Sequence, residues 1–320
     1  MQRIIVVPLD GSQLSEQSIP RATHLARTLG GALHLVRVHI PILAYQAAES
    51  AVAIPDPALD EQVRKADEEW LVRKAAQVKA SAGVPVTFEL RVGAPADEVV
   101  RVATERDAAY IVTTTHGHGG WAPQWLGSVA DAIIRHAPCP VLAMSESSVA
   151  APVDLHRILV PLDGSEASAA ILTYVREIAR ATGATVDLFR VVEPPLVGDV
   201  MNAVQRHNVD RFGIDAGADI AKVELDRVAQ DLAIGAIHAT TSVAIANNPT
   251  RAILDREAET KPDLVAMSTY GRGISRLFVG SVADKVLRAG SRPVLSWRPA
   301  REVPEPDTAR MFATAASGAV

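Results

Sequence analysis

The sequence predicts an α/β protein built from two tandem copies of a doubly wound parallel sheet of five strands. The chain repeats itself at an offset of 153 residues, so that IVVPLDGS at 5–12 returns as ILVPLDGS at 158–165. The block GSVADAIIRHAPCPVL at 127–142 returns in the same register as GSVADKVLRAGSRPVL at 280–295. In each copy, short apolar segments alternate with segments of helical periodicity, which is typical of parallel sheets covered by helices.

The elements of the first copy follow from apolar segments and their breaks. The expected strands cover 3–8, 33–39, 85–92, 108–113 and 140–144. The expected helices cover 14–29, 57–82, 96–105 and 128–136. Ser12 or Ser15 can cap the first helix, and Pro20 should kink that helix or set its start. The second copy repeats this order, with its long helix near 216–232.

The domain boundaries follow from the repeat and from two composition shifts. We expect one domain at 1–148, a second at 155–298 and a flexible tail at 299–320. The segment SESSVAAPVDL at 145–155 is small and contains proline, as linkers often do. The tail is rich in proline and small residues.

The composition limits the class of protein. The chain has 320 residues, of which 48% are hydrophobic and 22% are charged, with a net charge of −5. That charge argues against binding nucleic acid or an anionic membrane through bulk electrostatics. The N-terminus lacks the apolar segment of a signal peptide, and no apolar run is long enough to span a bilayer. We expect a cytoplasmic protein in which the single cysteine, Cys139, is structural.

The expected strand order 3-2-1-4-5 places a crevice between strands 1 and 4. Ligands of such sheets bind outside the carboxyl ends of the strands, where the order reverses. Two unusual segments meet there: PLDGS at 8–12, and a glycine-containing loop that runs from 114 to 128. The last strand of each copy should be an apolar sheet edge, so the two last strands should pair with each other.

The loop has the chemistry of an anion site. It reads Thr114-Thr115-His116-Gly117, then nine residues, then Gly127-Ser128 at the start of a helix. Free amides at a helix N-terminus favour a phosphate, and the Ser128 hydroxyl can donate to it. Across the crevice, Asp10 can accept from a ribose hydroxyl or an adenine amine, and Val38 can form an apolar wall. The alternative is a glycine-rich turn with a serine cap and no ligand.

PLDGS, the Gly117-x9-Gly127-Ser128 loop and the closing APCPVL together resemble the universal stress protein family in its tandem form. The resemblance implies an adenine-nucleotide alpha-hydrolase-like fold and the loop pattern G-x2-G-x9-G-[S/T] of ATP-binding members. ATP is the implied cofactor, with Mg²⁺ as an optional companion. The implied role is stress or growth-arrest regulation rather than catalysis, with antiparallel pairing of the last strands and a homodimer.

Carried over residue by residue, the resemblance implies nucleotide-binding residues in both copies and no catalytic or metal-ligating ones. In the first copy they are Pro8, Asp10, Val38, Thr114, His116, Gly117, Gly127, Ser128 and Val129. In the second copy they are Pro161, Asp163, Val191, Ser268, Gly271, Gly280, Ser281 and Val282.

Two departures from the family pattern leave other functions open. Thr114 and Ser268 stand where the pattern has its first glycine, and only eight residues separate Gly271 from Gly280. If the first position needs a positive φ or a close backbone approach, a side chain there weakens binding. One alternative is therefore a stress scaffold that has lost nucleotide binding. Another is a slow ATPase, which is disfavoured because no G-x-x-x-x-G-K-[ST] motif supplies a phosphate-binding lysine.

Overall fold

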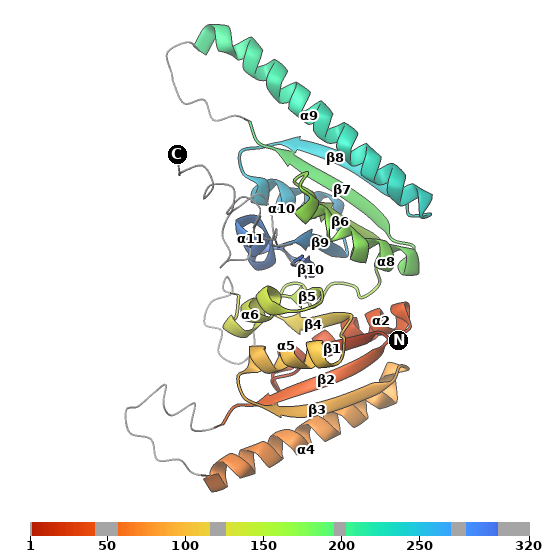
Figure 1. The fold of residues 1–320 in the computed structure, drawn as a ribbon, viewed down its shortest axis with the longest axis vertical. Coiled ribbons are helices and arrows are strands. Elements are labelled where there is room, and N and C mark those ends of the chain that lie inside the picture. The colour runs from red at the N-terminus through yellow and green to blue at the C-terminus, as the bar shows by residue number, and fades with distance from the viewer. Residues whose placement is uncertain (1, 42–56, 116–125, 195–202, 270–279, 300–320) are drawn as a thin grey trace, which may run out of the picture.

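A single ten-stranded sheet runs through the computed structural model, which describes residues 2–41, 57–115, 126–194, 203–269 and 280–299 (Figure 1). The strand order is β3-β2-β1-β4-β5-β10-β9-β6-β7-β8. The first half of the sheet therefore has the order 3-2-1-4-5. The second half has the same order read from the opposite edge of the sheet, so that the fifth strands of the two copies are neighbours. Both the fold class and the strand order predicted for each copy are confirmed.

The first lobe contains five strands and the helices between them. Its strands are β1 (Ile4–Pro8), β2 (Ala32–His39), β3 (Val86–Val92), β4 (Tyr110–Thr114) and β5 (Val141–Met144). Its helices are α1 (Gln13–Glu16), α2 (Ser18–Leu29), α4 (Pro57–Ala82), α5 (Pro95–Glu105) and α6 (Ser128–His136).

The second lobe repeats this series. Its strands are β6 (Arg157–Pro161), β7 (Thr185–Val192), β8 (Ala239–Ile245), β9 (Leu264–Ser268) and β10 (Val294–Trp297). Its helices are α7 (Glu166–Ala169), α8 (Leu172–Thr182), α9 (Ala203–Ile234), α10 (Pro249–Thr260) and α11 (Ser281–Ala289).

Two helices differ from the predicted ones. The helix expected over 14–29 is two helices, α1 and α2, which meet at Gln17. Pro20 is the third residue of α2, where its missing N–H costs no intrahelical bond, so proline sets the start of the helix. The helix expected near 216–232 is longer, because no proline interrupts the chain from Ala203 to Ile234.

Helices cover both faces of the sheet and bury one apolar cluster on each. On one face, α2, α4, α8 and α9 pack on side chains such as Ile5, Leu35 and Leu188. On the other face, α5, α6, α10 and α11 pack on the alternate side chains, such as Val6 and Val265. Each cluster contains residues of both lobes, so the core is continuous across the junction.

The two lobes join through the pairing of β5 with β10. These strands are antiparallel, with Leu142 opposite Leu295. The predicted antiparallel pairing of the last strands is therefore confirmed, and it occurs inside one chain. Since β4 and β9 occupy the other edges of β5 and β10, the expected self-association of two chains through these strands has no free edge to use.

The structure gives Cys139 an apolar setting directly before β5. Its side chain is buried, and burial raises the pKa of the thiol to about 12. At pH 8 the thiolate is then roughly one molecule in ten thousand. We expect the folded chain to react negligibly with a thiol reagent at pH 8 and to react fully in urea. Rapid labelling of the folded chain would contradict this burial.

Among the described residues, no helix combines the length and apolar character needed to cross a bilayer.

Candidate functional site

The two PLDGS segments form the same turn at the carboxyl ends of β1 and β6. In the first lobe, the carboxylate of Asp10 accepts a hydrogen bond from the Ser12 amide at 2.9 Å. Ser12 then caps α1 by accepting from the Ser15 amide at 3.0 Å, which confirms one of the two predicted caps. Each turn thus presents one carboxylate at the end of a central strand.

In the second lobe, the turn adds a side-chain hydrogen bond to the same backbone contact. Asp163 accepts from the Ser165 amide at 2.9 Å and also from the Ser165 hydroxyl at 2.6 Å. Asp10 is exposed, whereas Asp163 is half-buried. The two turns therefore share a backbone contact, and their carboxylates differ in exposure.

Four other residues predicted to bind the nucleotide lie at the carboxyl ends of β1, β2, β6 and β7. Pro8 and Pro161 end β1 and β6. Val38 and Val191 lie near the ends of β2 and β7, half-buried against the cluster on the α5–α6 and α10–α11 face. The sheet therefore brings Asp10, Pro8 and Val38 to one end of adjacent parallel strands, as predicted, and repeats this in the second lobe.

Thr114 and Ser268, the departures from the glycine pattern, end β4 and β9. Both are buried, at 7% exposure each, and neither has a positive φ. The side chains at these two positions therefore cause no left-handed backbone strain in the structure. Whether a glycine would allow a ligand to approach more closely stays a prediction.

Ser128 and Ser281 are the first residues of α6 and α11, at the same end of the sheet. Both serines are exposed, and no described side chain caps either helix. Val129 and Val282 follow in the first turn. Helix amides of the first turn have no intrahelical acceptor, so they can donate to an anion.

The glycines before these serines behave differently from the prediction. The Gly127 amide donates to the Thr115 carbonyl at 2.7 Å, and the Gly280 amide donates to the Thr269 carbonyl at 2.8 Å. These two amides are therefore engaged with backbone and are not the phosphate donors expected of them. A Cβ added at Gly280 would lie 2.8 Å from the Thr269 carbonyl oxygen, so this glycine permits a close backbone contact.

Three predicted residues, His116, Gly117 and Gly271, lie outside the described residues, as does the tail from 300 onward. Within the described part of the chain, no group of three or more His, Cys, Asp or Glu side chains could hold a metal ion.

Sequence reasoning missed one arginine in each lobe. Arg37 of β2 lies over Gly11, since a Cβ added at Gly11 would be 2.9 Å from Nη1. Its guanidinium is held by Asp67 of α4, with Nη2 to Oδ1 at 2.6 Å, and lies 5.3 Å from the Trp70 ring centroid. This arginine therefore ties the long helix to the turn that carries Asp10.

Arg190 repeats the arrangement in the second lobe. It lies over Gly164 and pairs with Glu224 of α9. Arg37 and Arg190 are related by the repeat offset, so the repeat itself was the signal that could have revealed them. Each arginine is already paired with a carboxylate of the long helix, so its role at the turn is to position the backbone.

Replacing Gly11 with alanine should cost more stability than replacing a glycine that has open space. Gly11 has a φ of +82° and the Arg37 contact, whereas Gly30 has a φ of +65° and nothing within 4 Å of an added Cβ. Backbone strain should cost each variant about 1–2 kcal/mol, and Gly11→Ala should lose roughly a further 1 kcal/mol. Urea unfolding measures both. Equal losses would mean that Arg37 moves aside freely.

This geometry defines a class of protein: a doubly wound α/β protein whose paired lobes each carry an acidic turn and, at the carboxyl edge of the sheet, a helix N-terminus that no described side chain caps. The chain belongs to the universal stress protein family, whose model matches residues 1–145 and 155–298. The recognition made from the sequence motifs is thereby confirmed.

Relatives of the same tandem length share this architecture. Universal stress protein Rv2005c of Mycobacterium tuberculosis is 24% identical over 92% of this chain and 96% of its own. A universal stress protein structure from Archaeoglobus fulgidus has a TM-score of 0.69 at 18% identity, covering 92% of this chain and 98% of its own. A further structure, of a universal stress protein in complex with cAMP, covers 44% of this chain at 25% identity, with a TM-score of 0.32.

Proposed function

We propose that this universal stress protein binds ATP at the carboxyl edge of each lobe and regulates a stress response without catalysing a reaction. The observation that carries the proposal is the repeated placement of an acidic turn after the first strand and a helix N-terminus after the fourth, at the same end of the sheet in both lobes. Asp10 and Asp163 offer acceptors for a nucleoside, and the first turns of α6 and α11 offer amide donors for phosphates.

The residues present fit an adenine nucleotide. The aspartate carboxylates lie at one side of each candidate site and the first-turn amides of α6 or α11 at the other. Val38 and Val191 add apolar surface for a base. Arg37 and Arg190, each paired with a carboxylate of the long helix, hold the acidic turns in place. The negative charge of the ATP phosphates would be stabilised by the first-turn amides of α6 and α11, and Mg²⁺ would reduce the remaining phosphate charge. We further propose a cytoplasmic setting and a homodimer that uses a surface other than β5 and β10.

A direct test is to purify the chain, denature it and measure released adenine nucleotide. We expect up to two nucleotides per chain, or a rise in Tm with millimolar ATP that adenosine alone reproduces only weakly. Binding to the native state raises stability in proportion to the logarithm of ligand concentration. No released nucleotide together with no change in Tm would contradict the proposal.

A stress scaffold without nucleotide is the second candidate, and one observation favours it. The Gly127 and Gly280 amides donate to backbone carbonyls, which removes two of the donors that phosphates would use. This candidate predicts no ATP-dependent change in Tm in either lobe. A slow ATPase ranks third, because the sequence has no phosphate-binding lysine motif to assist cleavage of the γ-phosphate.

A further inference from the structure

The junction between the lobes has a local twofold arrangement of its backbone. Leu142 pairs with Leu295, and these two residues are equivalent in the repeat. On either side, the pair Ala143 and Val294 is equivalent to the pair Ser296 and Val141. If the side chains followed this symmetry, the packing of α2 against the end of β5 would match the packing of α8 against the end of β10.

The side chains break this symmetry at one place. In the second lobe, the rings of Tyr174 on α8 and Trp297 on β10 pack edge to face, with centroids 5.2 Å apart. The equivalent residues of the first lobe are Arg21 on α2 and Met144 on β5. Two aromatic side chains in the second lobe thus correspond to two unbranched, non-aromatic side chains in the first.

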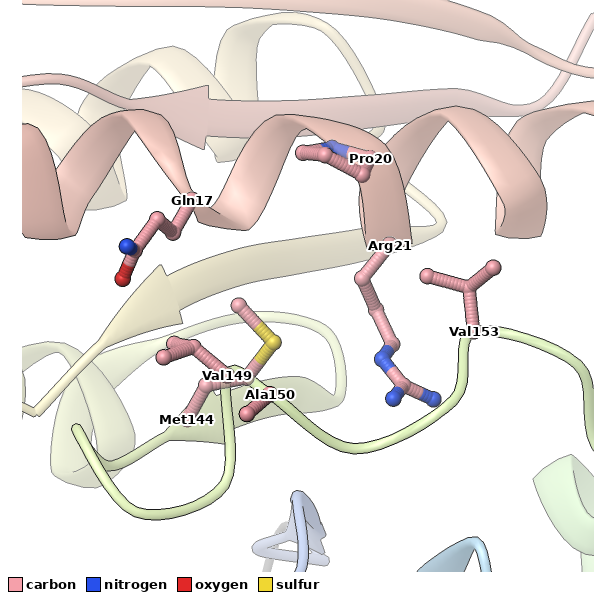
Figure 2. A pocket seen from close by; sticks show the side chains of 7 residues that line it. All are labelled: Gln17, Pro20, Arg21, Met144, Val149, Ala150 and Val153. Atoms are coloured by element: carbon pink, nitrogen blue, oxygen red, sulfur yellow. The ribbon is translucent and has the colours of Figure 1, made fainter.

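The first lobe has a cavity of about 190 Å³ at this place. Figure 2 shows Gln17, Pro20 and Arg21 of the α2 side facing Met144, Val149 and Val153 across it. Gln17 and Pro20 are exposed, so the cavity opens to solvent between α2 and the segment that links the lobes. Its walls are otherwise largely apolar.

Arg21 is fixed in the wall of the cavity. It is 96% buried, and its Nη2 donates to the Ala151 and Pro152 carbonyls at 3.1 and 2.6 Å. Its Nη1 is buried with no hydrogen-bond partner. The cavity therefore combines an apolar lining with a guanidinium that is held in place by the linker.

We propose that this cavity binds a small planar aromatic molecule of about the size of phenol. The cavity opens to solvent, and its volume of about 190 Å³ leaves room for one ring but not for a nucleotide. Met144 and Arg21 line the cavity at 1% and 4% exposure, and their sulfur and guanidinium are groups that favour contact with an aromatic ring. The ligand would supply to the first lobe the ring that Trp297 supplies to the second.

The proposal is tested on the full chain with 4-fluorophenol, followed by ¹⁹F NMR. We expect saturable binding at millimolar or lower concentration, unchanged by ATP because the cavity does not depend on the proposed nucleotide sites. Met144→Trp, which copies the second lobe, should weaken binding at least tenfold. Met144→Leu, the matched control of similar volume, should bind within about twofold of the unmodified chain.

Three results would overturn the proposal. These are no saturable signal with the unmodified chain, undiminished binding by Met144→Trp, and competition by cyclohexanol as strong as that by phenol. If Met144→Trp does not fold, Val149→Phe enters the cavity from the linker side and should cause the same loss. Retained binding by a folded Val149→Phe variant would likewise overturn it.

Discussion

Asp187→Ala should destabilise the chain by about 3 kcal/mol, because it leaves the half-buried Arg256 guanidinium without its buried partner and paired only with the exposed Glu259. Asp187 in β7 is fully buried, and its two carboxylate oxygens accept from Arg256 Nε and Nη2 at 3.0 Å each. Thr240 donates to the same carboxylate at 3.3 Å. Without the carboxylate, the Arg256 guanidinium, whose side chain is only 20% exposed, would keep its charge with its main partner gone.

The double variant Asp187→Leu with Arg256→Leu separates charge from packing. Removing both partners leaves no buried charge, so most of the lost free energy of unfolding should return. Urea unfolding of the two single variants and the double variant provides the measurement. A double variant as unstable as Asp187→Ala would show that the pair contributes through its shape rather than through its charge.

The first lobe supplies a matched comparison at the equivalent position. There His34 contacts Thr87 at 2.8 Å and Glu89 at 3.1 Å, and burial lowers the pKa of its imidazole. A neutral histidine leaves no uncompensated charge when it is replaced, so His34→Leu should cost only about 1–2 kcal/mol. The repeat thus preserves a buried polar position on the second strand while changing the chemistry that fills it.

The sequence alone predicted the parts of the fold that depend on local pattern. Apolar segments such as 3–8 and glycine-serine breaks such as Asp10-Gly11-Ser12 determine strand ends through burial and backbone freedom. The pairing of the last strands followed from the repeat, because two similar apolar edges in one chain can satisfy each other, whereas its antiparallel direction was implied by the family resemblance. The break at Gln17 was harder to place, since it depends on where the helix restarts before Pro20 rather than on a residue that forbids helix.

The missed parts depend on three-dimensional contacts. Nothing in residue identity indicates that the Gly127 amide donates to Thr115, because that bond depends on the path of the loop. Arg37 has an ordinary place on a strand, and only its position over Gly11 gives it a role in the candidate site. The same holds for Met144, whose importance appears only beside Trp297 in the other lobe.

Ser128→Asp should abolish most phosphate-dependent binding in the first lobe while leaving the fold intact. Ser128 is exposed at the first position of α6, where a carboxylate stabilises a helix by about 0.3–1 kcal/mol. The same carboxylate would repel a phosphate: like charges about 4 Å apart cost ~1 kcal/mol in water and ~4 kcal/mol at an effective dielectric of ~20. We expect ATP affinity at this site to fall about 10- to 100-fold, as measured by calorimetry.

Two comparisons make that result specific. Adenosine lacks phosphates, so its affinity should be the same for Ser128→Asp and the unmodified chain, and Ser128→Ala should lose only about fivefold for ATP through its missing hydroxyl. Ser281→Asp makes the equivalent change in α11, so the two variants together count the sites: each should remove one nucleotide per chain if both lobes bind. If ATP affinity survives both aspartates, the phosphates are not held at these helix ends. Since the Gly127 and Gly280 amides are already engaged, the start of α6 and α11 would then not account for binding, and the ATP phosphates would have to be held by other residues.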